Sequence, residues 1–407
     1  MYDIERIRND FPMLRSRSTV FLDNCATTLK PDCVIDAVTN YYTEICANAH
    51  RGDYDASYCV DRELEETRNG MAGFLNAGNS REIVFTGGAT AGLNLAAYGY
   101  GRKYLKPGDR ILTTEAEHSS GILPWMRVAE QTGAKLEFIP LAPDGSFQLE
   151  ALESMMNDRV KVIAAAQITN VLGYVIPIKE ICRIAHRYGA VVVVDGAQSV
   201  PHMPVDVRDL DCDFLAFSAH KMCGPTGIGV LYGKMDLLES MDPVFLGGAS
   251  NAGYDRDGNM QLKHPPYKFE SGTLPLEGIY GMHAALNYVS GIGMAEIHEH
   301  EKKIHDYIVK RLLEMDHIHI YNPHNETGIL TFNVKNLFAQ DIAAFFNKNR
   351  ISVRTGQHCS KLLEERLGTS STIRASVYLY TSQEEADRFV EVCSKATKEN
   401  CLKLFYD

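Results

Sequence analysis

The sequence predicts an α/β fold: a large domain with a mostly parallel, seven-stranded sheet flanked by helices, and a smaller α+β domain. Seven short runs of apolar residues recur between positions 83 and 232, separated by stretches long enough for crossover helices. The chain has 407 residues, more than one ordinary domain needs. After about residue 240 the alternation stops, which indicates a second domain of different organisation.

The predicted strands of the large domain follow one another along the chain. They lie at 83–86, 110–114, 136–140, 160–166, 190–195, 214–218 and 229–232. Residues 246–275 are rich in Gly, Asn, Asp and Pro, so we expect an irregular loop there. A helical segment begins after Leu276 and leads out of the large domain.

The smaller domain shows both helical and strand patterns. Its helical stripe consists of Ile304, Ile308, Leu312 and Met315. Residues 329–334 are strand-like, and the segment KLLEERLGT (361–369) predicts a short helix. Ser382, with Glu385 three residues later, forms a capping box that predicts the start of the last helix.

Composition excludes several classes of protein. Charged residues are 23% and hydrophobic residues 45%, as in a globular enzyme. The net charge of −11 argues against a nucleic-acid or anionic-membrane partner. The sequence shows neither a membrane-length apolar stretch nor a signal-peptide core, so we expect a cytoplasmic protein. Ten cysteines without a C-x-x-C pair indicate neither a disulfide framework nor a zinc ribbon.

Two residues at the predicted sheet edge indicate chemistry. Asp195 ends the apolar run VVVVD, and Lys221 follows the next strand, in SAHKMCGPTGIG. The carboxyl ends of parallel strands meet at one edge of a sheet, where α/β proteins bind ligands. A lysine with a readily deprotonated amine holds an aldehyde cofactor as an imine, and a buried aspartate suits a protonated pyridine nitrogen. The pair therefore predicts a site for pyridoxal 5'-phosphate (PLP).

Further motifs resemble one family, in the same order and over nearly the whole chain. They are HRG (50–52), EHSSGILPW (117–125), ITNVLG (168–173), VDGAQS (194–199), SAHKMCGPTGIG (218–229), FESGT (269–273), VRTGQHC (353–359) and RAS (374–376). These segments are similar to those of class V aminotransferase-fold enzymes (PLP fold type I), above all the Suf-type (group II) cysteine desulfurases, also called selenocysteine lyases. The resemblance implies a large PLP-binding domain at 21–280, a small domain from 1–20 and 281–407, and an active site between the domains at a homodimer interface.

A glycine-containing turn before a helix predicts the phosphate site, in TGGATAGLNLAAYGY (86–100). Backbone amides at a helix start, with hydroxyls beside them, bind phosphate. The resemblance implies five contacts, the last from the partner subunit: Ala89, Thr90, Ser218, His220 and Thr273. Relatives usually read Arg-Gly-Thr-Thr where this chain reads Gly-Gly-Ala-Thr at 87–90. One hydroxyl and one cation are therefore missing, and we expect weaker cofactor affinity.

The resemblance also assigns residues around the cofactor ring. His118, which follows Glu115 and Glu117, is implied to stack on the pyridine ring and to transfer protons at the substrate. Gln198 is implied to hydrogen-bond the phenolic oxygen, and Asn170 to lie near that oxygen and the substrate carboxylate.

Substrate recognition requires a cation for an amino-acid carboxylate, preferably the planar fork of arginine. Arg374, in the RAS motif before a strand-like run, is the main candidate, and Arg354 is a second. The resemblance places His50 and Arg51 at the entrance.

Cys359 decides between possible activities. It lies in RTGQHCSK (354–361), a glycine-containing loop with Arg354, His358 and Lys361 nearby. Cationic surroundings favour the thiolate, which is the nucleophilic form. Relatives commonly have two histidines before this cysteine, whereas the first position here is Gln357.

The resemblance implies a cysteine desulfurase that converts L-cysteine, or L-selenocysteine, to L-alanine. Lys221 is implied to act as the base at the α-carbon, and Cys359 to attack the substrate sulfur and keep it as a persulfide. An acceptor protein of the SufE or SufU type would then take the sulfur for iron–sulfur cluster or thiocofactor synthesis. Because the loop is short, we expect slow turnover that an acceptor raises.

Three other interpretations stay open. A different class V PLP enzyme, such as a selenocysteine-only lyase, a cysteine-sulfoxide lyase or an epimerase, would keep Lys221 without depending on Cys359. A metal-binding protein would use the pairs His298 and His300 or His317 and His319. Their i, i+2 spacing does not put two ligands on one helix face, so we expect no metal site. An inert binding subunit would not need the complete catalytic set.

Overall fold

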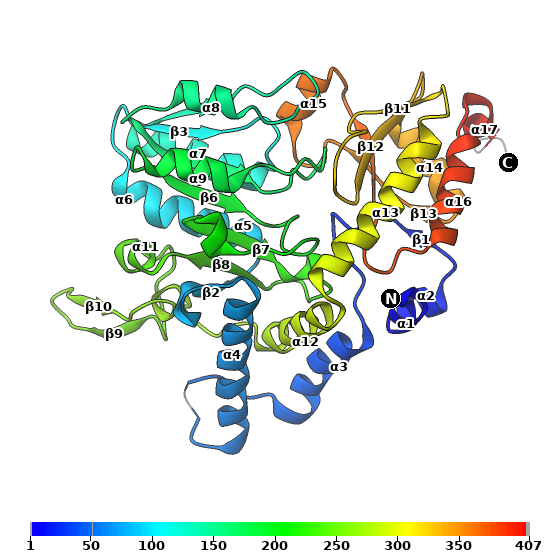
Figure 1. The fold of residues 1–407 in the computed structure, drawn as a ribbon. Coiled ribbons are helices and arrows are strands. Elements are labelled where there is room, and N and C mark those ends of the chain that lie inside the picture. Colours follow the sequence, from blue (N-terminus) through cyan, green and yellow to red (C-terminus); the bar gives the residue numbers. More distant parts are fainter. Residues whose placement is uncertain (1, 51, 404–407) are drawn as a thin grey trace.

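The computed structural model describes residues 2–50 and 52–403. The structure has two parts, one built on a seven-stranded sheet and one on a four-stranded sheet. Helix α13 (Met294–Leu312) leads from the larger part into the smaller one (Figure 1). Within the described residues, no helix has the length and apolar character needed to cross a membrane.

The large sheet is mostly parallel, as predicted. Its strands are β2 (Ile83–Thr86), β3 (Arg110–Thr113), β4 (Lys135–Phe138), β5 (Val160–Ala166), β6 (Val191–Asp195), β7 (Phe214–Ser218) and β8 (Gly229–Gly233). They lie in the order β2-β8-β7-β6-β5-β3-β4. Only the pairs that include β8 are antiparallel. The predicted fold class is confirmed, and each predicted strand end lies within two residues of the observed one.

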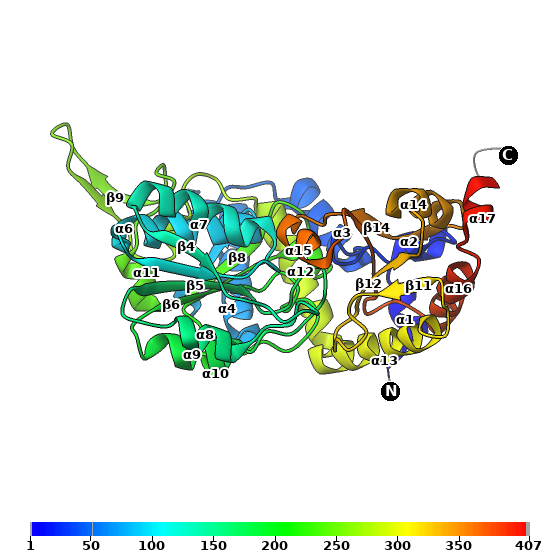
Figure 2. The same cartoon turned by 90° about the horizontal axis from the view of Figure 1, so that it is seen from above.

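Helices cover both faces of this sheet (Figure 2). In β6, Val191 and Val193 pack into one apolar cluster, whereas Val192 and Val194 pack into another, because successive side chains of a strand point to opposite faces. The helices of this part are α3 (Asp32–Asn40), α4 (Asp55–Phe74), α5 (Ala89–Ala96), α6 (Arg102–Tyr104), α7 (Ser119–Thr132), α8 (Leu149–Met155), α9 (Ile178–His186), α10 (Val207–Leu210), α11 (Met235–Ser240) and α12 (Leu276–Ile292).

The smaller sheet has the order β11-β12-β15-β14, with antiparallel neighbours. Its strands are β11 (Ile318–Ile320), β12 (Ile329–Val334), β14 (Arg354–Gly356) and β15 (Thr372–Ser376). Helices α13, α14 (Ala339–Lys348), α15 (Lys361–Leu367), α16 (Gln383–Ser394) and α17 (Lys398–Lys403) accompany it. The predicted stripe is confirmed, since Ile304, Ile308 and Leu312 are buried in its core. The Ser382–Glu385 capping box is confirmed at the start of α16.

The N-terminal segment contacts both parts. Helices α1 (Ile4–Asn9) and α2 (Pro12–Ser16) precede β1 (Val20–Phe21), which pairs in parallel with β13 (Ile351–Ser352). Val20 packs in the core of the smaller part, whereas Phe11 packs in the core of the larger part with Tyr380. The domain boundaries at residues 20 and 280 remain a proposal.

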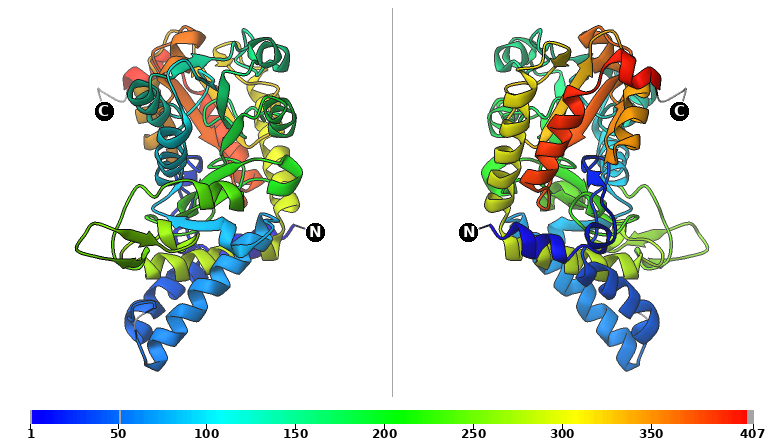
Figure 3. Two further views of the ribbon diagram at one scale, coloured as in Figure 1. Left: turned by 90° about the vertical axis from the view of Figure 1, so that its left-hand side faces the viewer. Right: turned by 90° about the vertical axis from the view of Figure 1, so that its right-hand side faces the viewer.

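The prediction of an irregular loop at 246–275 was wrong for its middle. Residues there form an antiparallel hairpin of β9 (Asn251–Tyr254) and β10 (Met260–Leu262), which projects from the large part (Figures 1 and 3). Asp255 organises the turn, because its carboxylate accepts backbone N–H bonds from Asp257 and Asn259. The hairpin lacks an alternating apolar pattern because it has no face on the core, so its sequence resembled a loop.

Candidate active site

A pocket of about 240 Å³ opens between the two sheets. Ala166, Asp195 and Ser218, which end three neighbouring strands, line it from the larger part. Arg354 and Arg374 line it from the smaller part. The structure brings into this pocket every predicted site residue except His50, Arg51 and Thr273. Residues far apart in sequence therefore share one site.

Lys221 lies on a single 3₁₀ turn (Ala219–Lys221) directly after β7. Its side-chain nitrogen forms no hydrogen bond or ion pair with any residue that the structure describes. Burial lowers the pKa of Lys221, and the nearby Asp195 carboxylate opposes that shift only in part. A lysine with a lowered pKa has more of the neutral, nucleophilic amine at neutral pH.

Asp195 is buried at the end of β6, and its Oδ1 accepts the backbone N–H of Ala197 at 2.9 Å. Gln198 donates from Nε2 to the carbonyl of Cys25 at 2.9 Å, while its buried Oε1 has no partner among the described residues. Both residues line the pocket, which has room for a ligand.

Glu117 is a buried acid that the sequence marked only as a neighbour of His118. Its carboxyl accepts hydrogen bonds from the Thr114 hydroxyl at 2.8 Å and the Ala166 N–H at 2.7 Å. Burial, with the charge of Asp195 as a smaller cause, raises the pKa of Glu117 to about 8. Glu117 is therefore mostly protonated at neutral pH, which limits the negative charge beneath the pocket. The strand-end position was the available signal, but its burial was not visible in the sequence.

His118 caps the N-terminus of α7, because its Nδ1 accepts the backbone N–H of Ser120 at 3.1 Å. A ring nitrogen that accepts this bond carries no proton, so the neutral ring carries its proton on Nε2. Burial lowers the pKa of His118. The Ser120 hydroxyl lies 3.1 Å from Nδ1 and 2.8 Å from the hydroxyl of Thr90, a link that sequence reasoning missed.

The predicted phosphate site lies at the start of α5. Gly88 caps the helix with φ +133°, a conformation that favours glycine, and a Cβ there would meet the Ser218 hydroxyl oxygen at 3.1 Å. Ser218 accepts the N–H of Ala89 at 2.7 Å, and Thr90 adds a second hydroxyl. Burial lowers the pKa of His220 to about 4, so its ring is neutral. The cradle thus relies on amides and hydroxyls rather than on a side-chain cation.

Arg374 is buried in β15 and half of its fork is engaged. Its Nη1 donates to the carbonyl of Asn170 at 2.7 Å, whereas Nε has no hydrogen-bond partner among the described residues. Arg354 lies directly opposite on β14, and its side chain is 47% exposed. Its Nη2 lies 3.8 Å from Oδ1 of Asp23, and Arg374 lines the pocket, where its guanidinium suits a carboxylate ligand.

Cys359 is exposed, and its backbone is held from two sides. Its carbonyl accepts hydrogen bonds from the N–H and the hydroxyl of Ser119, both at 2.8 Å. The Asn170 side chain donates to the carbonyl of His358 at 2.8 Å and accepts from the Ser360 hydroxyl at 2.9 Å. His358 and Cys359 have φ values of 49° and 58°, a left-handed conformation that these bonds stabilise.

The contribution of His358 to a cationic loop was predicted wrongly. Its ring is buried, and its Nε2 lies 3.0 Å from the hydroxyl of Thr372. Burial, followed by the charge of Arg374, lowers the pKa of His358 to about 3, so the ring is neutral. Positive charge near Cys359 therefore comes from Arg354 and Arg374, which line the same pocket.

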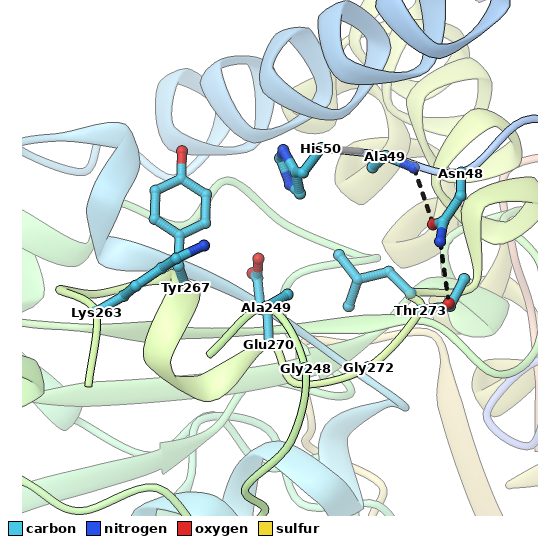
Figure 4. A pocket seen from close by; sticks show the side chains of 11 residues that line it. Asn48, Ala49, His50, Gly248, Ala249, Lys263, Tyr267, Glu270, Gly272 and Thr273 are labelled. Carbon is cyan, nitrogen blue, oxygen red and sulfur yellow. Dashed lines mark hydrogen bonds between the residues drawn. The ribbon is translucent and has the colours of Figure 1, made fainter. Parts of the chain in front are cut away.

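His50 and Thr273 lie in a separate hollow of about 390 Å³ (Figure 4). Asn48 donates to the Thr273 hydroxyl at 3.4 Å, and the N–H of His50 donates to Asp61 at 2.7 Å. Arg51 lies outside the described residues. Thr273 is thus not placed at the pocket of its own chain.

Residues 20–389 match the model of the aminotransferase class-V family. The chain belongs to this family. The predicted family membership is confirmed.

Three relatives align with almost the whole chain. A probable cysteine desulfurase of Halalkalibacterium halodurans is 42% identical over 399 residues, 97% of both sequences. The solved structure of the cysteine desulfurase CsdA (S-sulfonic acid) of Escherichia coli has a TM-score of 0.92 and 33% identity, covering 99% of both chains. The apo structure of the cysteine desulfurase of Thermococcus onnurineus has a TM-score of 0.93 and 38% identity, covering 97% of this chain and 98% of that one.

Class-V enzymes use PLP, and the pocket fits this cofactor. The buried Asp195 suits a protonated pyridine nitrogen, and the start of α5 with Ser218 and Thr90 suits a phosphate. Lys221, with its lowered pKa, suits an aldehyde carbon. The pyridine nitrogen, the phosphate and the aldehyde of PLP therefore each meet a matching residue type.

Proposed function

We propose that this protein is a cysteine desulfurase that converts L-cysteine to L-alanine and keeps the sulfur as a persulfide on Cys359. The observation that carries the proposal is the position of Cys359. It is an exposed thiol at the pocket that also holds Lys221 and Arg374, on a loop held by Ser119 and Asn170. The relatives named as cysteine desulfurases support the same activity.

Cofactor binding is assigned to residues of the larger part. Asp195 would pair with the pyridine nitrogen, His118 would stack on the ring, and Gln198 would hydrogen-bond the phenolic oxygen. The phosphate would take the amides at the start of α5 and the side chains of Thr90, Ser218 and His220. When bound, PLP supplies an electron sink that stabilises negative charge at the substrate α-carbon.

Substrate orientation is assigned to the two arginines. The guanidinium of Arg374, which lines the pocket, would receive the α-carboxylate, and the opposite Arg354 would add a second cation. This arrangement leaves the substrate side chain free to point toward Cys359 in the same pocket.

Proton and sulfur transfer follow from three side chains. The Lys221 amine takes the proton from the substrate α-carbon, and His118 carries a proton on Nε2. The Cys359 thiolate attacks the substrate sulfur, so that an S–S bond forms as the Cβ–S bond breaks. The electron pair of the broken bond goes to Cβ, which takes up a proton, and Lys221 returns a proton to the α-carbon. The products are L-alanine and a persulfide on Cys359, and no external oxidant is needed.

The wider setting of the enzyme is part of this proposal. Because Thr273 does not line its own chain's pocket, it is assigned to the phosphate site of the partner in a homodimer. His50 and Arg51 are assigned to the entrance of that site. The exposure of Cys359 suits delivery of sulfur to a small acceptor protein with its own thiol, in the cytoplasm.

The test is incubation of the PLP-loaded protein with L-cysteine. With dithiothreitol present as the reductant that releases the persulfide sulfur, equal amounts of alanine and sulfide are expected. Without it, mass spectrometry should show one added sulfur, about 32 mass units, on the Cys359 peptide. Cys359→Ala should bind PLP but release no alanine, whereas Cys33→Ala, which removes another exposed thiol, should behave like the wild type. Pyruvate as the product, or wild-type desulfuration by Cys359→Ala, would refute the proposal.

A further inference from the structure

The turn that carries Lys221 is short and strained. It consists of a single 3₁₀ turn (Ala219–Lys221), which is too short to be stable through its own hydrogen bonds. Cys223, two residues later, has a φ of 64°, a left-handed conformation that is unfavourable for a residue with a side chain. The position of the Lys221 side chain therefore depends on contacts from outside the turn.

Those contacts come from residues 27–30 of the N-terminal segment. The carbonyl of His220, directly before Lys221, accepts the N–H of Thr28 at 3.0 Å. The same carbonyl accepts the Thr28 hydroxyl at 3.1 Å, and that hydroxyl in turn accepts the N–H of Cys223 at 2.9 Å. One buried threonine thus holds the backbone on both sides of Lys221.

Lys30 adds a charged donor to the same carbonyl. Its Nζ donates to the carbonyl of His220 at 3.0 Å, to the hydroxyl of Thr27 at 3.4 Å and to the carbonyl of Thr28. An ammonium has three N–H donors, so these three acceptors satisfy it completely. Burial lowers the pKa of Lys30 to about 8, and the ammonium form still predominates at neutral pH. Lys30 is therefore committed to the backbone around this turn.

The 27–30 segment is itself fixed to the body of the protein. Leu29 is buried, and its N–H donates to the hydroxyl of the buried Tyr380 at 2.9 Å. Neither Thr28 nor Lys30 is among the residues that line the pocket. The two side chains therefore act on a bound ligand only through the turn after β7.

We propose that Thr28 and Lys30 are positioning residues that fix the turn of Lys221, so that its amine reaches both the cofactor and the substrate α-carbon. The inference rests on the proposed function, because it assumes that Lys221 binds PLP and moves the α-proton. Without these hydrogen bonds the turn samples more conformations, and the amine spends less time at the reacting atoms. Affinity for the amino acid, which is assigned to Arg374, should change little.

The first measurement is deuterium exchange of the PLP-loaded enzyme, followed by mass spectrometry of the peptide that spans residues 219–223. Thr28→Val keeps the shape of the side chain but removes its hydroxyl. The peptide should then exchange about fivefold faster or more, as expected for the loss of one or two hydrogen bonds. Thr28→Ser keeps the hydroxyl and should restore the wild-type exchange rate.

The second measurement is exchange of the α-proton of L-alanine for deuterium by the PLP-loaded enzyme, followed by nuclear magnetic resonance. This exchange requires Lys221 but neither Cys359 nor desulfuration. Thr28→Val and Lys30→Met should lower the rate at saturating alanine roughly tenfold or more, because small displacements of a reacting group have large effects on rate. The alanine concentration at half-saturation should stay within about twofold of the wild type, since the arginines are untouched.

The matched control is Lys268→Met. It removes another buried lysine, which donates to the carbonyls of Glu239 and Met241 away from the pocket, and both measurements should stay at wild-type values. Lys30 is only partly buried, so Lys30→Met keeps the test decisive if Thr28→Val does not fold.

Three results would overturn the inference. They are wild-type rates in the folded Thr28→Val or Lys30→Met variant, equal losses in Thr28→Ser and Thr28→Val, and weaker alanine binding with an unchanged maximal rate. A wild-type enzyme that exchanges the α-proton of alanine but makes no alanine from cysteine would contradict the proposed function alone.

Discussion

Replacing Arg68 with methionine should strongly destabilise the protein. Arg68 on α4 is 1% exposed and pairs with Glu270, which is 2% exposed, through two bonds of 2.8 and 2.9 Å. Its Nη1 also donates to the carbonyl of Ile83 at 2.7 Å. Methionine keeps the volume of the side chain but leaves the Glu270 carboxylate buried without a cation. Breaking a buried ion pair in this way costs about 3–5 kcal/mol.

Adding Glu270→Gln to Arg68→Met should recover part of this loss. Glutamine removes the buried charge, and its side-chain oxygen still accepts the N–H of Phe85, as Glu270 does at 2.8 Å. The double variant should then cost about 1–2 kcal/mol, the value of the lost hydrogen bonds. Arg15→Met is the matched control. It breaks the exposed Arg15–Asp32 pair and should cost about 1 kcal/mol or less.

Urea unfolding measures these free energies through the fluorescence of Trp125, the chain's one tryptophan, which is 1% exposed. Arg68→Met should also release PLP faster on dialysis, because Glu270 lies three residues before Thr273. A cost below about 1 kcal/mol for Arg68→Met, or a double variant no more stable than the single one, would refute the reasoning.

Three further predictions concern the pocket. The purified protein should be yellow, and borohydride should bleach the visible band and label the peptide that contains Lys221. Lys221→Ala should lose both the label and turnover. A colourless protein that gains no band with PLP would contradict the assignment of Lys221 as the residue that binds the cofactor. Arg374→Ala should raise the KM for cysteine at least tenfold, roughly 1.4 kcal/mol or more, in steady-state kinetics, and unchanged saturation would remove Arg374 from the site. The pKa of Glu117 is about 8 in the folded protein and near 4.5 in an unfolded chain, so the native state binds the extra proton and stability falls as pH rises through this window. In urea unfolding between pH 5 and 9, the free energy of unfolding of the wild type should therefore fall by an amount that approaches about 1.4 kcal/mol per pH unit, whereas that of Glu117→Gln should not. Parallel pH profiles for the two proteins would contradict a buried proton on Glu117.

Local residue patterns were enough to predict the elements around the site. Six of the seven strands are short apolar runs between turn residues with mostly buried side chains, so each run is readable without its neighbours, whereas the edge strand β4 is only partly buried. Asp195 and Lys221 were readable for a related reason, since Asp195 ends such a strand and Lys221 follows another. The β9–β10 hairpin was missed because neither of its faces packs on the core.

The sequence by itself determined the fold class, the family and the residue types that meet in the pocket, because strand periodicity and motif order are local properties of the chain. Only the tertiary structure decided how those residues are connected. Asn170 engages the Cys359 loop, Ser119 holds the carbonyl of Cys359, and Asp23 lies between Arg354 and Arg374. These pairs are separated by about 190 to 350 positions, and their contacts arise from packing the two parts together. Burial also arises only there, which is why the protonation of Glu117 and the neutrality of His358 could not be predicted from the sequence.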